Sequence, residues 1–120
     1  MKNISINDNR LIIDGFEVLF KHEIKEFVEI GEVVVVRLGI KCRDDDINNI
    51  YGVIDGKIAW RVQDMLEYNI NCKPFLPDPY TAISIYKKDP GLIIANTSEG
   101  YRMLINPTNG KIVGEESWTK

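Results

Sequence analysis

Asn49–Val62 reads NIYGVIDGKIAWRV, and this stretch decides how the rest of the chain is interpreted. Asp55-Gly56 in its middle is a strong signal for a two-residue β-hairpin turn, because both residue types tolerate a positive φ. The flanking residues are rich in β-branched and aromatic side chains, which favour strands. We therefore predict a hairpin whose second strand begins at Lys57 and contains Trp60.

A looser copy of this hairpin lies near the end of the chain, at Tyr101–Glu116, YRMLINPTNGKIVGEE. Each copy has a tyrosine-led strand followed by a Gly-Lys-Ile step that opens the next strand, at Gly56 and at Gly110. Self-similarity of this kind indicates an internal repeat of one supersecondary unit. We interpret the two glycines as turn residues, their lysines as solvent-facing and Trp60 as a packing residue.

Working outward from the first hairpin, the sequence predicts four strands in each half of the chain. Val33–Val36 is an unbroken β-branched run, which is typical of a central strand buried on both faces. In residues 22–30, Ile24, Phe27 and Val28 have helical spacing, whereas Ile24, Val28 and Ile30 would share one strand face. We favour a strand, because Gly31-Glu32 can form a two-residue turn. Residues 24–62 then form one antiparallel meander, and residues 81–118 form a second.

The N-terminal residues 4–20 predict three short strands that begin with a small hairpin and include a turn at Asp14-Gly15. Phe16, Val18 and Phe20 alternate along the third strand, so we expect them to face the core.

Residues 63–80 form the connection between the two meanders. A helical turn is expected at most over residues 63–68, because the prolines that follow exclude regular structure. The predicted fold class is all-β: two antiparallel four-stranded meanders with a blade-like repeat, plus an N-terminal hairpin, packed as one domain over residues 1–120. Whether the meanders form a sandwich, a barrel-like sheet or adjacent blades stays open at this stage.

The composition is that of an ordinary soluble protein, with 44% hydrophobic and 28% charged residues. The formal net charge is −3 and neither half of the chain is basic, which argues against nucleic-acid binding through phosphate contacts. No apolar run is long enough for a membrane span or a signal peptide. We therefore expect a cytoplasmic protein, in which Cys42 and Cys72 are reduced thiols.

The first hairpin resembles the blade repeats of quinoprotein-type and WD-type β-propellers, although closed propellers have at least about four blades. Over about residues 24–116, the chain resembles a diffuse group of small bacterial proteins. These proteins share an N-I-Y-x-V-x-x-x-G-K-I-x-W hairpin, a D-P-Y step and a terminal G-Y-R…G-K-I segment, which are Asn49–Trp60, Asp78–Tyr80 and Gly100–Ile112 here. Small β proteins of this sort occur among bacterial toxin immunity proteins. The resemblance implies no catalytic residue.

We found no motif that carries a metal, a cofactor or a catalytic site. Asp44, Asp45 and Asp46 lack the glycine and glutamate spacing of a calcium loop, so we interpret them as a solvated loop. His22 is the only histidine, which excludes a two-histidine zinc site. The glycines match no phosphate-binding or nucleophile-elbow motif. We expect no cofactor.

Protein binding is therefore the favoured function, most concretely as an immunity protein that neutralises a basic toxin domain. Asp44, Asp45 and Asp46 would steer such a partner, and Phe75 and Tyr80 would anchor it, unless their loop is a lid over the core. The alternative is a small hydrolase or carbohydrate-binding domain that uses surface carboxylates beside Trp60 or Tyr80. A third hypothesis is a homo-oligomer that pairs through an exposed edge strand.

Overall fold

The computed structural model describes residues 2–40, 47–68, 79–98 and 100–116. This part of the chain contains eleven strands and one helical turn, α1 (Met65–Tyr68). The strands are β1 (Ile4–Asn7), β2 (Arg10–Ile13), β3 (Phe16–Leu19), β4 (Ile24–Ile30), β5 (Val33–Leu38), β6 (Ile50–Ile54), β7 (Lys57–Arg61), β8 (Tyr80–Ile85), β9 (Ile93–Thr97), β10 (Arg102–Ile105) and β11 (Ile112–Glu115). The all-β fold and the short helical turn are both confirmed.

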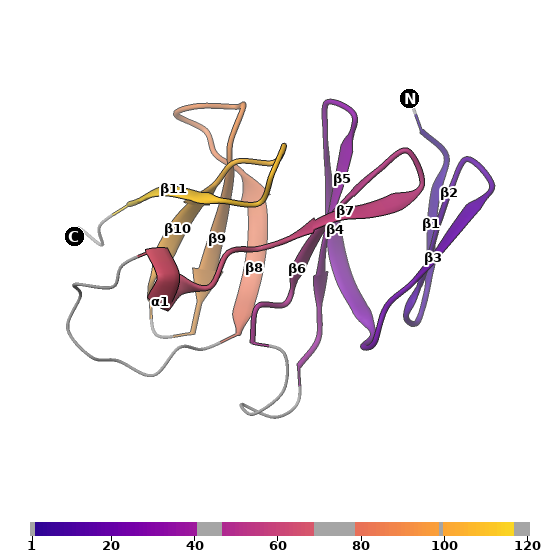
Figure 1. The fold of residues 1–120 in the computed structure, drawn as a ribbon, viewed down its shortest axis with the longest axis horizontal. Coiled ribbons are helices and arrows are strands. Elements are labelled where there is room, and N and C mark those ends of the chain that lie inside the picture. The colour runs from indigo at the N-terminus through magenta and orange to yellow at the C-terminus, as the bar shows by residue number, and fades with distance from the viewer. Residues whose placement is uncertain (1, 41–46, 69–78, 99, 117–120) are drawn as a thin grey trace.

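Three antiparallel sheets lie side by side (Figure 1). We call them the first sheet (β1-β2-β3), the middle sheet (β4-β5-β6-β7) and the last sheet (β8-β9-β10-β11). Within each sheet every strand pairs with the next one in sequence, so each sheet is a meander. The predicted N-terminal strands and the two four-stranded meanders are thus confirmed.

The middle sheet is covered on both faces, and β5 shows this most clearly. Val34 and Val36 pack in an apolar cluster with side chains of the first sheet, such as Leu11. Val33 and Val35 pack in a second cluster with side chains of the last sheet. All four valines are buried, which confirms the predicted central strand and explains why the run does not alternate.

One prediction on β4 needs a correction. Ile24, Val28 and Ile30 were expected to share one strand face, but the register shifts between Ile24 and Glu26. A bulge of this kind moves the preceding side chains to the other face. Ile24 accordingly packs with the first sheet, whereas Val28 and Ile30 pack towards the last sheet.

Trp60 joins the middle sheet to the turn between β10 and β11. Its indole Nε1–H donates a hydrogen bond of 2.7 Å to the carbonyl oxygen of Pro107. A Cβ on Gly52 would lie 2.1 Å from the ring, and a Cβ on Gly110 would lie 2.3 Å from it, so both glycines are needed for close packing. Only 8% of Trp60 is exposed, in agreement with its predicted packing role.

Asn49 holds the middle and last sheets together at the start of β8. Its Oδ1 accepts a hydrogen bond of 2.8 Å from the backbone N–H of Tyr80. Its Nδ2 donates to the carbonyl oxygens of Tyr80, at 3.0 Å, and Leu38, at 2.7 Å. Because Asn49 is buried, these three bonds satisfy a polar side chain that would otherwise destabilise the core.

Candidate functional site

Of the five residues proposed from the sequence as partner contacts, the structure describes only Tyr80. Asp44, Asp45, Asp46 and Phe75 lie outside the described residues, as do Cys42 and Cys72. Tyr80 is described, and only 1% of it is exposed. Burial, followed by the charge of Asp64, raises the pKa of Tyr80 above its ordinary value. Tyr80 is therefore a core residue in this conformation and offers a partner no surface.

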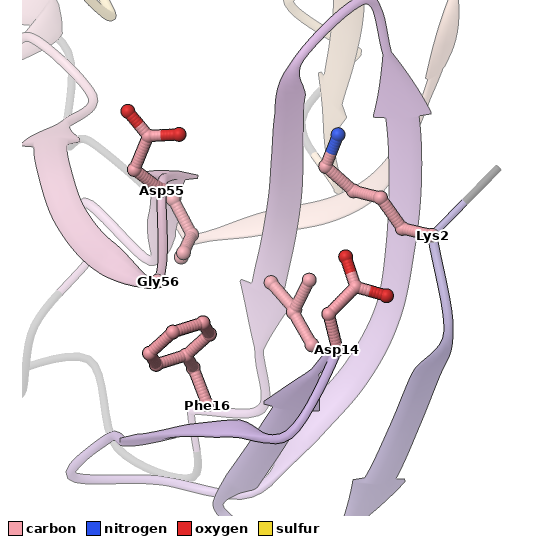
Figure 2. Close-up of a pocket in the computed structure, with 7 residues that line it drawn as sticks. Lys2, Asp14, Phe16, Asp55 and Gly56 are labelled. Atoms are coloured by element: carbon pink, nitrogen blue, oxygen red, sulfur yellow. The ribbon is translucent and has the colours of Figure 1, made fainter.

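A pocket between the first and middle sheets is the candidate site, and we call it the inter-sheet pocket (Figure 2). Its volume is about 340 Å³, at the lower end of the range for ligand-binding pockets. Its lining residues are Lys2, Ile13, Asp14, Phe16, Val53, Asp55 and Gly56.

Two Asp-Gly turns meet at this pocket. Asp14-Gly15 connects β2 to β3, and Asp55-Gly56 connects β6 to β7. All four residues have a positive φ, between 48° and 88°, which places both turns in the conformation that favours Asp and Gly. The two turns predicted from the sequence are thus confirmed. Because both turns border the pocket, the carboxylates of Asp14 and Asp55 belong to the same site.

Phe16 is the aromatic residue of the pocket, and its exposure corrects a prediction. It was expected in the core with Val18 and Phe20, which are buried, yet 63% of Phe16 is exposed. It pairs with Ile13, so it is on the core-facing side of its strand, but it lies at the strand end beside Gly56 (Figure 2). A Cβ on Gly56 would lie 3.1 Å from the Phe16 side chain, which shows how closely they pack.

The pocket combines apolar and charged surfaces. Ile13 and Val53 are buried and form apolar parts of its lining. Ile58 pairs with Val53 across β6 and β7 and is 44% exposed, which extends the apolar surface next to the pocket. Lys2 and the two aspartates give the lining a formal charge of −1 at neutral pH. This arrangement suits a cationic group on an apolar stem.

Trp60 and Tyr80, the two aromatic residues considered for a carbohydrate or hydrolase site, are both buried. No three His, Cys, Asp or Glu side chains within the described ranges are grouped to hold a metal ion. Among the same residues, no helix is long and apolar enough to cross a membrane.

Residues 1–117 match a protein family described as Domain of unknown function (DUF7957). The chain belongs to this family. The match spans all three sheets, so the fold described above is the fold of this DUF7957 domain. No curated protein matches the sequence.

Among solved structures, this DUF7957 domain is similar to the crystal structure of the computationally designed Ika8 protein. The TM-score is 0.54 at 10% sequence identity, and the alignment covers 94% of this chain and 35% of that chain. The domain thus spans about a third of the length of the designed protein. At this identity the similarity concerns the fold alone.

Three residues of the inter-sheet pocket, Asp14, Asp55 and Gly56, carried a turn signal in the sequence, and the other lining residues did not. Asp14 and Asp55 were recognisable as hairpin-turn residues, but only the stacking of two sheets places them together. Phe16 looked like a core residue, because alternation reports which face a side chain is on and not how far the neighbouring sheet extends.

Proposed function

We propose that this DUF7957 domain is a non-enzymatic protein-binding module, and that the inter-sheet pocket receives a basic side chain of its partner. The observation that carries the proposal is Phe16, a largely exposed aromatic ring beside two carboxylates and an apolar pocket lining. Exposed apolar surface rimmed by polar groups is typical of interaction sites.

An arginine fits these surfaces part by part. Its aliphatic stem would lie on Ile13 and Val53, and its guanidinium would reach the carboxylates of Asp14 and Asp55. The ring of Phe16 would add a cation–π contact. Lys2 also lines the pocket, so its positive charge would oppose the binding of a cationic ligand.

The most concrete form of the proposal is a cytoplasmic immunity protein that neutralises a basic toxin domain. The mildly acidic charge and the sequence resemblance described above support it.

We also propose that residues 24–62 and 81–118 are blade-like repeats within one domain, and two observations support this. Gly56 and Gly110 both have a positive φ in the last turn of their sheet, and each is covered by an aromatic ring of the preceding sheet, Phe16 and Trp60.

The pocket can be tested without knowing the partner, by titrating the ¹⁵N-labelled domain with N-acetyl-arginine amide. We expect amide shifts at Phe16 and Gly56, and binding at least about tenfold weaker in the double variant Asp14→Asn/Asp55→Asn. Lys2→Gln should bind more tightly. Asn keeps the turn conformation, so the double variant removes charge and little else.

Asp8→Asn is the matched control, because Asp8 also has a positive φ in a turn of the first sheet but does not line the pocket. It should bind like the wild type. Unchanged affinity of the double variant, or shifts confined to another surface, would reject the inter-sheet pocket as the binding site.

The immunity form has its own test, which is co-expression with the product of the neighbouring reading frame. A complex that protects cells from that product, and that Phe16→Ala weakens, would support it. If the two proteins form no complex and give no rescue, the immunity form is wrong, whatever the arginine titration shows.

A further inference from the structure

A second pocket lies on the face of the last sheet that is turned away from the middle sheet. Ile93 and Ala95 on β9 pack in the cluster shared with the middle sheet, so Ile94 between them is on the opposite face. Ile94 lines this pocket, whose volume is about 380 Å³. The other lining residues are Ser84, Ile85, Tyr86, Lys87, Lys88, Arg102 and Glu116, and we call it the Glu116 pocket.

Three donors converge on the carboxylate of Glu116. The hydroxyl of Tyr86 donates to Oε2 at 3.0 Å, and Lys88 Nζ lies 3.0 Å from the same oxygen. Arg102 Nη1 lies 3.2 Å from Oε1. The hydrogen bonds from Lys88 and Tyr86 lower the pKa of Glu116, so the carboxylate is ionised at neutral pH.

The charges of the pocket do not balance. Lys87, Lys88 and Arg102 are cationic and Glu116 is the only anionic lining residue, which leaves a formal charge of +2. The whole chain has a formal charge of −3. A positive pocket on an acidic protein attracts anions to one place, and lysine and arginine are the side chains that bind carboxylate and phosphate best.

We propose that the Glu116 pocket is an oxyanion-binding site, in which a carboxylate or phosphate group of a ligand replaces the Glu116 carboxylate between Tyr86, Lys88 and Arg102. Glu116 is an internal occupant that holds the donors in position. Glu116 lies just beyond the end of β11, so a rotation of its side chain alone would release the donors. A ligand must therefore compete with Glu116, and its affinity depends on the charge of that residue.

The test is a titration of the full chain with inorganic phosphate and, separately, with acetate, followed by amide shifts at constant ionic strength. Glu116→Gln should bind at least about tenfold more tightly than the wild type, because the internal competitor loses its charge. Adding Arg102→Gln to Glu116→Gln should abolish the gain. A preference for phosphate would identify a phosphate site, and a preference for acetate would identify a carboxylate site.

Glu17→Gln is the matched control. Glu17 pairs with Arg10 at 2.6 Å on the first sheet, so its removal also releases an arginine from a glutamate. If Glu17→Gln gains as much affinity as Glu116→Gln, the effect is one of net charge and the proposal is wrong. It is also wrong if neither phosphate nor acetate shifts the amides of the last sheet in any variant.

A third variant keeps the test valid if Glu116→Gln perturbs folding. Lys88 has a largely exposed side chain, so Lys88→Gln should fold normally. It removes one of the three donors, and we expect at least about threefold weaker phosphate binding in the otherwise wild-type chain. An unchanged affinity in this variant would contradict the proposal on its own.

Discussion

Gly110 and Gly15 show, at the scale of one residue, two different reasons for a glycine. Both have a positive φ, +76° and +88°, which side chains rarely adopt. A Cβ on Gly110 would lie 2.3 Å from Trp60, whereas a Cβ on Gly15 would have nothing within 4 Å. Gly15 thus serves only the turn, and Gly110 serves both the turn and the contact with the indole ring.

These two glycines allow a direct comparison of strain and packing. We expect Gly15→Ala to lower the free energy of unfolding by about 1 kcal/mol, which is the cost of a left-handed conformation. Gly110→Ala should cost about 3 kcal/mol or more, because the ring of Trp60 must also move. Urea denaturation of both variants measures the difference. Equal costs would mean that Trp60 does not pack against Gly110 in solution.

The residues of the inter-sheet pocket show what local sequence can and cannot predict. The Asp14-Gly15 and Asp55-Gly56 turns follow from the conformational preferences of Asp and Gly, and the structure has both. Their proximity depends on residues of other strands that bury the first sheet against the middle one. No spacing in the sequence reports that distance. The position of Phe16 depends on it in the same way.

At the scale of single elements, β5 was predictable and β4 was only partly so. A run of four valines has no polar face, so β5 has to be buried on both sides. The bulge in β4 inserts a residue beside Glu26, whose Oε2 lies 2.6 Å from Arg37 Nε and accepts a hydrogen bond of 3.1 Å from the N–H of Ile83. These partners explain why a charged residue interrupts the apolar pattern of β4. They belong to β5 and β8, so the β4 sequence could not reveal them.

We expect the stability of the protein to depend on pH through the ionisation of Glu116, next to the last sheet. The pKa of Glu116 is lowered in the folded protein, first by the hydrogen bond from Lys88 and then by that from Tyr86. The stability that comes from a lowered carboxylate pKa is present above the unfolded pKa and is lost as the pH falls through the folded one. We therefore expect wild-type stability to fall as the pH drops below the ordinary pKa of a glutamate, about 4.3, and Glu116→Gln to remove part of that fall.

The measurement is the urea midpoint of the wild type, Glu116→Gln and Glu115→Gln across this pH range. Glu115 is the exposed neighbour on β11, so Glu115→Gln should keep the wild-type profile. Tyr86 and Lys88 have raised pKa values, Tyr86 mainly by burial and Lys88 by its hydrogen bond to Glu116. Both groups are protonated at neutral pH, so their deprotonation would weaken the cluster only in alkaline solution. Identical acid profiles in all three proteins would show that Lys88 and Tyr86 do not lower the pKa of Glu116 in solution.

At the scale of the whole molecule, the middle sheet takes part in both apolar clusters. One of its faces is covered by the first sheet and the other by the last sheet (Figure 1). The sequence predicted the strands of all three sheets, but it left their packing open, because hairpin signals are local and sheet stacking is not. The shared middle sheet implies that the three sheets are energetically coupled.

Leu11 and Leu19 test this coupling, since they are the same residue type on neighbouring strands of the first sheet. Leu11 is fully buried against the middle sheet, and 59% of Leu19 is exposed. Leu11→Ala should lower the free energy of unfolding by about 2–5 kcal/mol, and Leu19→Ala by less than about 0.5 kcal/mol. Amide exchange in β10 reports on the last sheet, and no residue of that sheet belongs to the apolar cluster that contains Leu11. If the sheets unfold together, Leu11→Ala reduces the protection of the β10 amides by the same free energy. Unchanged protection in β10 would show instead that the last sheet unfolds independently, and that the middle sheet does not transmit the loss.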